Sequence, residues 1–257
     1  MSSRRTGVST LNLRPQGQNL TYGIANELGV AIVTGVYSAD NPIPIEAELC
    51  RKYDASRPVL REAVKMLTAK GLLAARPRRG TWVQPEEKWN LLDPDVLGWL
   101  LERKYSPALL IEFTEIRLAM EPGAAALAAR AAGPEEKAAI RAGIERMQAA
   151  DRGDDDPLDS DIAFHVAVLR GSRNRFYAQL TGFTATALRF SIQTTNRYKG
   201  VQLASIADHK KVADAILAGN AAAAGEAMRK LIQEALDLIT KREAQQSARR
   251  LSARTGR

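Results

Sequence analysis

The chain has 257 residues, of which 45% are hydrophobic and 26% charged, and its formal net charge is +8. This length favours two domains, and the apolar content is sufficient for a core in each. The chain has no signal peptide and no apolar run near the length of a membrane span, so we expect a cytoplasmic protein with no membrane partner. The single cysteine, Cys50, excludes a disulfide framework and a cysteine-rich metal site.

The net positive charge comes from the two ends of the chain. Residues 1–18 contribute +3 and residues 241–257 contribute +5, whereas 28 basic and 28 acidic residues balance each other between them. We therefore expect a disordered tail over 1–18 and a basic tail over 244–257. Such tails add non-specific affinity for phosphate.

A winged helix-turn-helix DNA-binding domain is predicted over residues 19–85. After a leading helix up to Gly35, residues 46–53 form a short helix and Ser56 is a suitable N-cap for a second one. The second helix repeats apolar residues at helical spacing, namely Leu60, Ala63, Val64 and Leu67, and ends at Gly71. Residues 72–76 and 81–83 are predicted to be the strands of a hairpin. This order is typical of domains that place one helix in the DNA major groove.

A stripe of basic residues runs along the second helix beside the apolar one. Arg57, Arg61 and Lys65 recur every four residues, and the run from Arg51 to Arg79 holds nine basic and two acidic residues. Most charged stripes are only solvated helix faces. Here the local excess of +7 favours contacts with DNA phosphates and bases.

Beyond a linker over 86–92, residues 93–243 are predicted to be helical throughout. Expected helices cover 94–104, 107–132, 135–150, 158–170, 174–196, 202–218 and 220–243. No strand-like alternation interrupts them, and the loops are short. The predicted fold is therefore mostly α, with a winged helix-turn-helix followed by an all-α antiparallel helical bundle.

The first domain resembles the winged helix of GntR-type bacterial transcription regulators. The resemblance lies in Pro44–Leu49 (PIEAEL), in Ser56-Arg57 with Arg61-Glu62-Ala63, and in Gly80–Val83 (GTWV). Ala47 departs from the pattern, because family members often carry a DNA-contacting Arg there. Together with the basic stripe, the resemblance implies DNA contacts from Ser56, Arg57, Arg61, Lys65, Arg78, Arg79, Gly80 and Thr81.

The second domain resembles the FCD ligand-binding domain found in the fatty-acid-regulator-like branch of this family. The resemblance implies a homodimer that binds double-stranded palindromic operator DNA and responds to a small carboxylate effector. Within the branch, residues 89–99 (WNLLDPDVLGW) resemble those of D-galactonate operon repressors. We therefore predict a repressor of sugar-acid catabolism genes, with an amino acid, a dicarboxylate or a fatty-acid derivative as alternative effectors.

Asp161 and His165, four residues apart, share a helix face, as two ligands of one metal ion must. His209 lies on a later helix. The spacing alone also fits an alternative without metal, in which Asp161 and His165 form an ordinary hydrogen bond and His209 is an unrelated polar residue. The resemblance implies that these three residues bind a divalent metal cofactor, zinc or similar. It also implies a further His in the last helix, where this chain has Leu231.

The resemblance further implies an effector site. Arg117 corresponds to the arginine that pairs with the effector carboxylate in the branch, and the other corresponding residues are Asn174, Arg189, Gln193 and Asn196. Two alternatives remain open at this point. A buried Arg117 is equally satisfied by Glu112, Glu115 or Glu121, and Asn174 is equally suited to cap a helix.

Two other classes of protein fit parts of this sequence. A metal site with an arginine would serve a hydrolase, but the chain has no nucleophile motif, phosphate loop or catalytic pair of carboxylates. A nucleoid-like protein would use the basic tails and bind DNA without sequence preference. We therefore predict a regulator that is not an enzyme.

Overall fold

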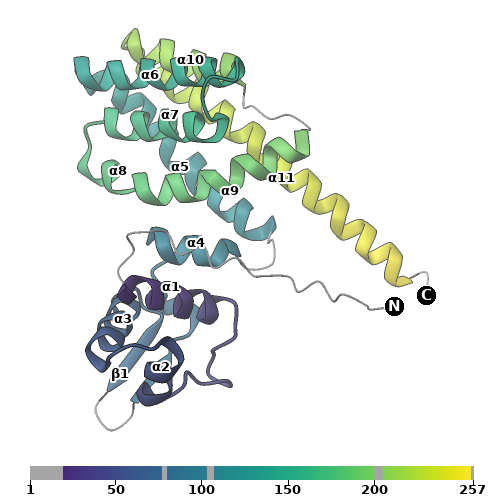
Figure 1. The fold of residues 1–257 in the computed structure, drawn as a ribbon. Helices are drawn as coiled ribbons and strands as arrows, with labels where there is room; N and C mark the ends of the chain where they lie inside the picture. The colour runs from purple at the N-terminus through teal and green to yellow at the C-terminus, as the bar shows by residue number, and fades with distance from the viewer. Residues whose placement is uncertain (1–19, 77–79, 103–106, 200–204, 256–257) are drawn as a thin grey trace, which may run out of the picture. The chain divides into compact units, whose positions relative to one another are not determined.

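The computed structural model describes residues 20–76, 80–102, 107–199 and 205–255, apart from the side chains of residues 102, 193–199 and 246–255. The chain divides into two compact units, Met1–Asn90 and Leu91–Arg257 (Figure 1). The described residues form eleven α-helices and one two-stranded sheet, which confirms the mostly α fold class. None of the described helices is long and apolar enough to cross a membrane.

The first unit is a winged helix-turn-helix. Its elements are α1 (Leu20–Val33), α2 (Glu46–Tyr53), α3 (Arg57–Ala69), β1 (Leu73–Arg76) and β2 (Gly80–Val83). The two strands pair antiparallel, with Leu73 opposite Val83 and Arg76 opposite Gly80. Helix α3 packs against α1, α2 and β1, so it is the central element of this unit.

The apolar stripe of α3 is buried as its spacing predicts, with one difference. Leu60, Ala63 and Leu67 are almost completely buried, whereas Val64 is half-buried because it lines a surface hollow described below. Ser56 occupies the N-cap position of α3, but its side chain makes no capping hydrogen bond. The predicted N-cap position is therefore confirmed, and Ser56 contributes to it through its carbonyl, which accepts from Leu60 N.

The segment after the wing is fixed to the first unit as far as Asn90. Asn90 N donates to the Lys70 carbonyl (2.9 Å), and the Trp89 indole Nε1 donates to the Gln84 carbonyl (3.0 Å). Gly71 has a φ of +80°, and a Cβ at this position would overlap the carbonyl oxygen of Lys88. The residues that follow β2 therefore continue the packing of the first unit, including a 3-10 turn, η1 (Glu86–Lys88).

The second unit is a bundle of eight described helices (Figure 1). Their bounds are α4 (Pro94–Glu102), α5 (Pro107–Ala131), α6 (Pro134–Asp151), α7 (Pro157–Gly171), α8 (Arg175–Gln179), α9 (Thr181–Lys199), α10 (Ile206–Leu217) and α11 (Ala221–Thr255). Helix α7 packs against α5, α6, α8 and α9, and α11 packs against α5, α9 and α10. The bundle therefore encloses α7, on which two of the predicted metal ligands lie.

Two predicted helices have different bounds in the structure. The single helix expected over 174–196 is two helices, α8 and α9, which are separated at Leu180, the C-cap residue of α8. The last helix continues through Thr255, beyond its expected end at residue 243, because residues 244–255 contain no Gly or Pro.

Candidate functional site

The predicted DNA-contacting residues of α3 are exposed, and Glu46 of α2 holds two of them. Arg61 Nε and Nη2 donate to the two Glu46 carboxylate oxygens at 3.0 and 3.2 Å. Arg57 Nε lies 3.8 Å from the same carboxylate. The hydrogen bond from Arg61 lowers the pKa of Glu46. The two arginines are therefore gathered at one point on the N-terminal half of α3.

The remaining predicted DNA contacts lie nearby or outside the described residues. Lys65 pairs with Glu62 on α3, with Nζ 3.1 Å from the carboxylate. Gly80 begins β2 with a φ of +79°, a conformation that favours glycine, and Thr81 follows it. Arg78 and Arg79, at the tip of the wing, lie outside the described residues.

In the second unit, the structure brings the three predicted metal ligands together in the bundle interior. Asp161 and His165 come from α7 and His209 from α10, and each is about 2% exposed. One ligand atom from each residue lies within 4.8 Å of the others. The ring of Phe164 makes T-shaped contacts with both imidazoles, at centroid distances of 5.7 Å to His165 and 5.2 Å to His209, and so places hydrocarbon beside the cluster.

Hydrogen bonds orient both imidazoles in the same sense. His209 Nδ1 lies 2.8 Å from the Ser205 carbonyl, which can only accept, so Nδ1 carries a proton and donates it. His165 Nδ1 likewise donates to Glu121 Oε2 at 2.6 Å. Nε2 of each ring then faces Asp161 Oδ1, at 3.4 Å from His165 and 3.2 Å from His209. This is the orientation that metal-binding histidines adopt.

Two of these facing atoms have no hydrogen-bond partner among the described residues. Asp161 Oδ1 and His209 Nε2 are both fully buried and unsatisfied. The two atoms lie 3.2 Å apart, and each buried polar atom without a hydrogen-bond partner is costly. A cation bound by both atoms would remove both costs. The donor set of one carboxylate and two imidazoles suits zinc and similar divalent metals.

Glu121 joins the cluster to Arg117 on the same helix, α5. Arg117 Nε donates to Glu121 Oε1 at 2.6 Å, and Arg117 Nη2 lies 3.5 Å from His165 Nε2. All of these side chains are buried. Of the three glutamates considered for Arg117, Glu121 is therefore its partner. Glu121 is also the site residue that spacing alone left unassigned, and its only signal was its position four residues after Arg117.

Burial and ion pairing act in opposite directions on the acids of this cluster. Burial by itself would raise the pKa of Glu121, but Arg117 and His165 outweigh it and lower this pKa to about 2. Burial would likewise raise the pKa of Asp161, and the imidazoles of His209 and His165 hold it well below its ordinary value. For His165, burial is outweighed by Glu121 and Asp161, which raise the pKa. The cluster thus favours positive charge beside two ionised carboxylates.

Asn174 and Arg189, two other predicted effector residues, make their described contacts outside this cluster. Asn174 caps α8, with its side-chain oxygen accepting from Phe176 N at 2.9 Å. Arg189 is half-exposed and pairs with Asp159 at 2.9 Å. The side chains of Gln193 and Asn196 lie outside the described residues. Arg117 is therefore the predicted effector residue that the structure places against the predicted metal ligands.

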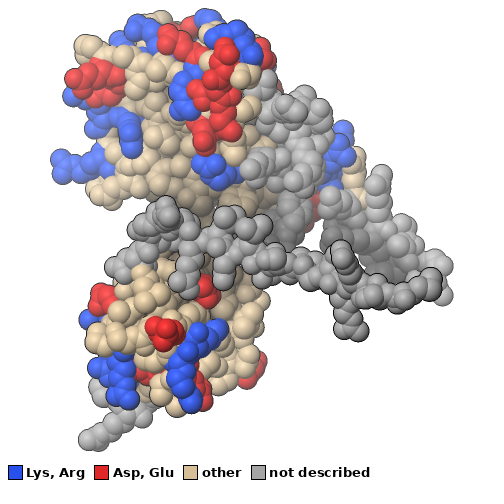
Figure 2. Space-filling model, in the orientation of Figure 1, with Lys and Arg blue, Asp and Glu red and all other residues tan. Residues whose placement is uncertain are grey.

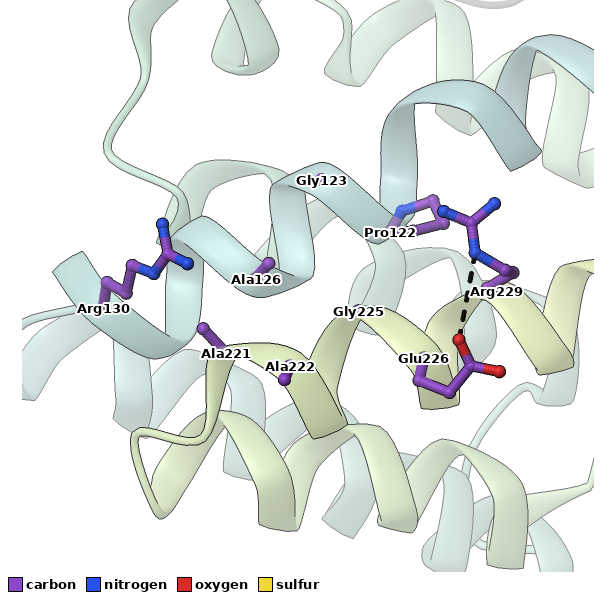
Figure 3. A pocket seen from close by; sticks show the side chains of 9 residues that line it. All are labelled: Pro122, Gly123, Ala126, Arg130, Ala221, Ala222, Gly225, Glu226 and Arg229. Carbon is purple, nitrogen blue, oxygen red and sulfur yellow. Dashed lines mark ion pairs between the residues drawn. The ribbon is translucent and has the colours of Figure 1, made fainter.

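A separate groove of about 370 Å³ lies between α5 and the start of α11 (Figure 3). Small residues such as Gly123, Ala126 and Gly225 form its floor. Arg130 and Arg229 stand along it, with Arg229 4.0 Å from Glu226. Arg117, Asp161, His165 and His209 are not among the described residues that line this groove, so it is distinct from the buried cluster.

The surface of the described residues carries no single sign of charge. Figure 2 shows Lys and Arg next to Asp and Glu on the visible face of each unit. On α3 this mixture takes the form of the pairs with Glu46 and Glu62. The basic stripe of α3 is therefore partly neutralised in the free chain.

Comparison with known proteins decides the family. Residues 20–83 match the model of bacterial regulatory proteins of the gntR family, and residues 112–234 match the FCD domain. The galactonate operon transcriptional repressor of Escherichia coli (strain K12) is 35% identical over 199 residues, which are 77% of this chain and 87% of that protein. The chain belongs to the gntR family. This regulator carries an FCD domain, and it is not an enzyme.

Other relatives agree with this membership. The Escherichia coli regulator YieP is 32% identical to this gntR-family regulator over 220 residues, which are 84% of the chain and 94% of YieP. The solved structure of Lar, described as controlling the agr system of Listeria monocytogenes, covers 87% of the chain with a TM-score of 0.55. At 16% identity, that likeness concerns the fold alone.

Proposed function

We propose that this gntR-family regulator is a homodimeric repressor of sugar-acid catabolism genes, which binds palindromic operator DNA through α3 and the wing. The observation that carries the proposal is the 35% identity with the galactonate operon transcriptional repressor, which spans both of this chain's units. The exposed arginines of α3 support the DNA-binding part, because guanidinium groups pair with phosphates and with guanine edges. The buried cluster of the second unit supports the effector part.

In this proposal Asp161, His165 and His209 hold a divalent cation such as zinc. Two observations support this metal site. Asp161 Oδ1 and His209 Nε2 are buried without a hydrogen-bond partner, and His165 Nε2 faces the same point. When bound, the metal would supply positive charge and open coordination positions to an oxygen-rich ligand. Leu231 is half-buried against the apolar core of the bundle and offers no ligand atom. We therefore expect weaker metal binding than in relatives with a His at that position.

The proposed effector is a small hydroxy acid whose carboxylate pairs with Arg117. The Arg117 guanidinium is buried and donates through Nε to Glu121, and its Nη2 lies 3.5 Å from His165 Nε2, so an acid bound at its terminal nitrogens would lie beside the metal ligands. Hydroxyl groups of the acid would meet the polar cluster and its metal. A carboxylate with adjacent hydroxyls, as in an aldonate, fits both partners.

The metal is tested by zinc titration and thermal unfolding after exhaustive chelation. A ligand present at 100 times its Kd stabilises a folded protein by about 2.7 kcal/mol, so chelation should lower the Tm measurably. Asp161→Asn should abolish the zinc-dependent rise in Tm. Asp159→Asn is the matched control, because Asp159 lies on the same helix but pairs on the surface with Arg189, and it should retain that rise. Equal behaviour of the two variants would contradict the metal assignment.

The effector is tested by calorimetric titration with D-galactonate and other hydroxy acids. Arg117→Lys is a more specific test than Arg117→Ala. Lysine keeps a cation beside the buried Glu121 carboxylate but lacks the planar guanidinium that binds a carboxylate through two nitrogens. We expect Arg117→Lys to lose most of its affinity for the acid and to bind operator DNA as the unchanged chain does. Acid binding at full strength by this variant would contradict the role of Arg117.

A further inference from the structure

Ile45 stands at a position in the first unit for which isoleucine is poorly suited. It is the N-cap residue of α2, with φ −64° and ψ 157°, and its side chain makes no capping hydrogen bond. Ser, Thr, Asp and Asn are preferred at this position because their oxygens accept from free backbone N–H groups, and isoleucine is among the poorest residues there. The backbone carbonyl of Ile45 accepts from Glu48 N and Leu49 N, so only the side chain departs from the preferred pattern.

The Ile45 side chain is also 67% exposed to solvent. A single exposed apolar residue is ordinary and needs no explanation. At Ile45, however, the exposure coincides with the loss of a helix cap, so this residue fails two local preferences together. Residues that break local preferences without a structural gain are concentrated at functional sites.

The residues around Ile45 indicate what function its exposed side chain serves. Ile45 lines a hollow of about 520 Å³ whose apolar wall includes Pro44, Leu49, Leu60 and Val64. Four of the predicted DNA-contacting residues line the same hollow, namely Arg61, Lys65, Gly80 and Thr81. An apolar side chain is therefore displayed among the cations and the wing residues that would meet DNA.

The neighbouring residue fixes the distance between Ile45 and the recognition helix. Glu46 follows Ile45 directly in the chain and accepts two hydrogen bonds from Arg61 of α3. The Ile45 side chain is thus held at the start of α2, close to the guanidinium expected to contact a base. A rigid spacing of this kind would let the two side chains contact neighbouring positions of one DNA site.

In the major groove, the only apolar group on a base edge is the 5-methyl group of thymine, and apolar side chains recognise it by contact. We propose that Ile45 is a specificity-determining residue that contacts a thymine methyl group in each half of the operator. The inference rests on the operator binding proposed above. It adds a base preference that arginine contacts do not supply.

The test begins with the full-length protein and a library of random duplex DNA, from which the preferred sequence is selected. Each thymine of that sequence is then replaced singly by uracil, which removes the methyl group and keeps every hydrogen-bonding atom. One thymine per half-site should prove sensitive, with a loss of affinity of about three- to tenfold for one buried methyl group. In Ile45→Ser, the same replacement should cause no further loss.

Two controls separate this contact from a folding defect. Ile45→Ser supplies a favourable N-cap, so its Tm should equal or exceed that of the unchanged protein even though its affinity falls. Val36→Ser changes another exposed apolar residue of the same unit, 53% exposed and outside the hollow, and should leave the thymine dependence intact.

The remaining outcomes are distinguishable. If a preferred sequence is found but no thymine-to-uracil replacement matters, or if the loss persists in Ile45→Ser, the methyl contact is wrong and operator binding stands. If selection yields no preferred sequence at all, the operator binding of the proposed function fails, and this inference fails with it.

Discussion

At the scale of single residues, the pairing of Arg61 with Glu46 bears directly on DNA recognition. In the free chain, the guanidinium uses Nε and one terminal nitrogen to bind both oxygens of the carboxylate. This surface pair contributes little to stability, because both groups remain largely hydrated. Its effect is instead to restrict the rotamers of a long side chain, so that less conformational freedom is lost when DNA binds. We therefore propose that Glu46 positions Arg61 for the predicted DNA contact.

Arg57→Ala and Arg61→Ala should each weaken binding to the selected operator by about tenfold or more, because a guanidinium that contacts a base or phosphate contributes that much. Equilibrium titration against labelled duplex measures the effect. Arg51→Ala is the matched control, since it removes one positive charge from an exposed site on α2 outside the predicted contacts. Unchanged affinity in both arginine variants would mean that α3 is not the recognition helix.

The sequence predicted which residues meet in the buried cluster, but not which hydrogen-bond partners they have there. The spacing of Asp161 and His165 placed both on one helix face, and the structure confirms this. The sequence left Glu112, Glu115 and Glu121 open as partners of Arg117, although only Glu121, four residues away, faces Arg117 along a helix. Only the packing of α5 against α7 makes Glu121 the buried partner, by placing it beside His165.

At the scale of elements, apolar spacing predicted the helices well where strong stop signals were present. Gly133 and Pro134 separate α5 from α6 as expected, and Pro157 begins α7. The turn at Leu180 has neither Gly nor Pro, so residues 174–196 read as continuous. The Thr181 hydroxyl bonds to the Ala178 carbonyl of the preceding turn, but many serines and threonines make this bond within unbroken helices. This hydroxyl therefore does not reveal the turn in the sequence.

The close approach of α6 and α7 leads to a prediction about the cluster. A Cβ at Gly143 of α6 would lie 3.0 Å from the Cα of Phe164, next to His165. Gly143→Ala should therefore push α7 away from α6, lower the Tm and weaken zinc binding together, with a destabilisation of about 1–3 kcal/mol. Thermal unfolding and zinc titration measure the two effects.

Gly98→Ala is the matched control for this variant. Gly98 lies within α4, and a Cβ there would meet Thr186 at 3.9 Å, an ordinary contact. Alanine in a helix interior is favoured over glycine by about 0.5–1 kcal/mol, so the control should be neutral or stabilising. If Gly143→Ala were as stable as Gly98→Ala, the interface between α6 and α7 would not be as tight as described.

At the scale of the whole molecule, the division of the chain determines what each unit can do alone. The boundary falls between Asn90 and Leu91, inside the predicted linker of residues 86–92. The packing of Trp89 and the hydrogen bond of Asn90 to Lys70 keep the first part of that segment on the winged helix. A fragment that ends at Asn90 therefore keeps the hydrogen bonds of Trp89 and Asn90 to the first unit, whereas a fragment that ends at Pro85 lacks both.

Residues 1–90 alone should fold, remain monomeric and lose about 10²- to 10⁴-fold in operator affinity. We propose that the second unit carries the dimer interface, and linking two half-site contacts raises the effective concentration of the second one by a factor of this order. Sedimentation equilibrium and operator titration measure the two properties. A fragment of residues 1–85, which lacks Trp89, should have a lower Tm than residues 1–90. That difference would show that the longer fragment keeps the packing of Trp89. Operator binding by residues 1–90 as tight as that of the full chain would remove the bundle from the recognition mechanism.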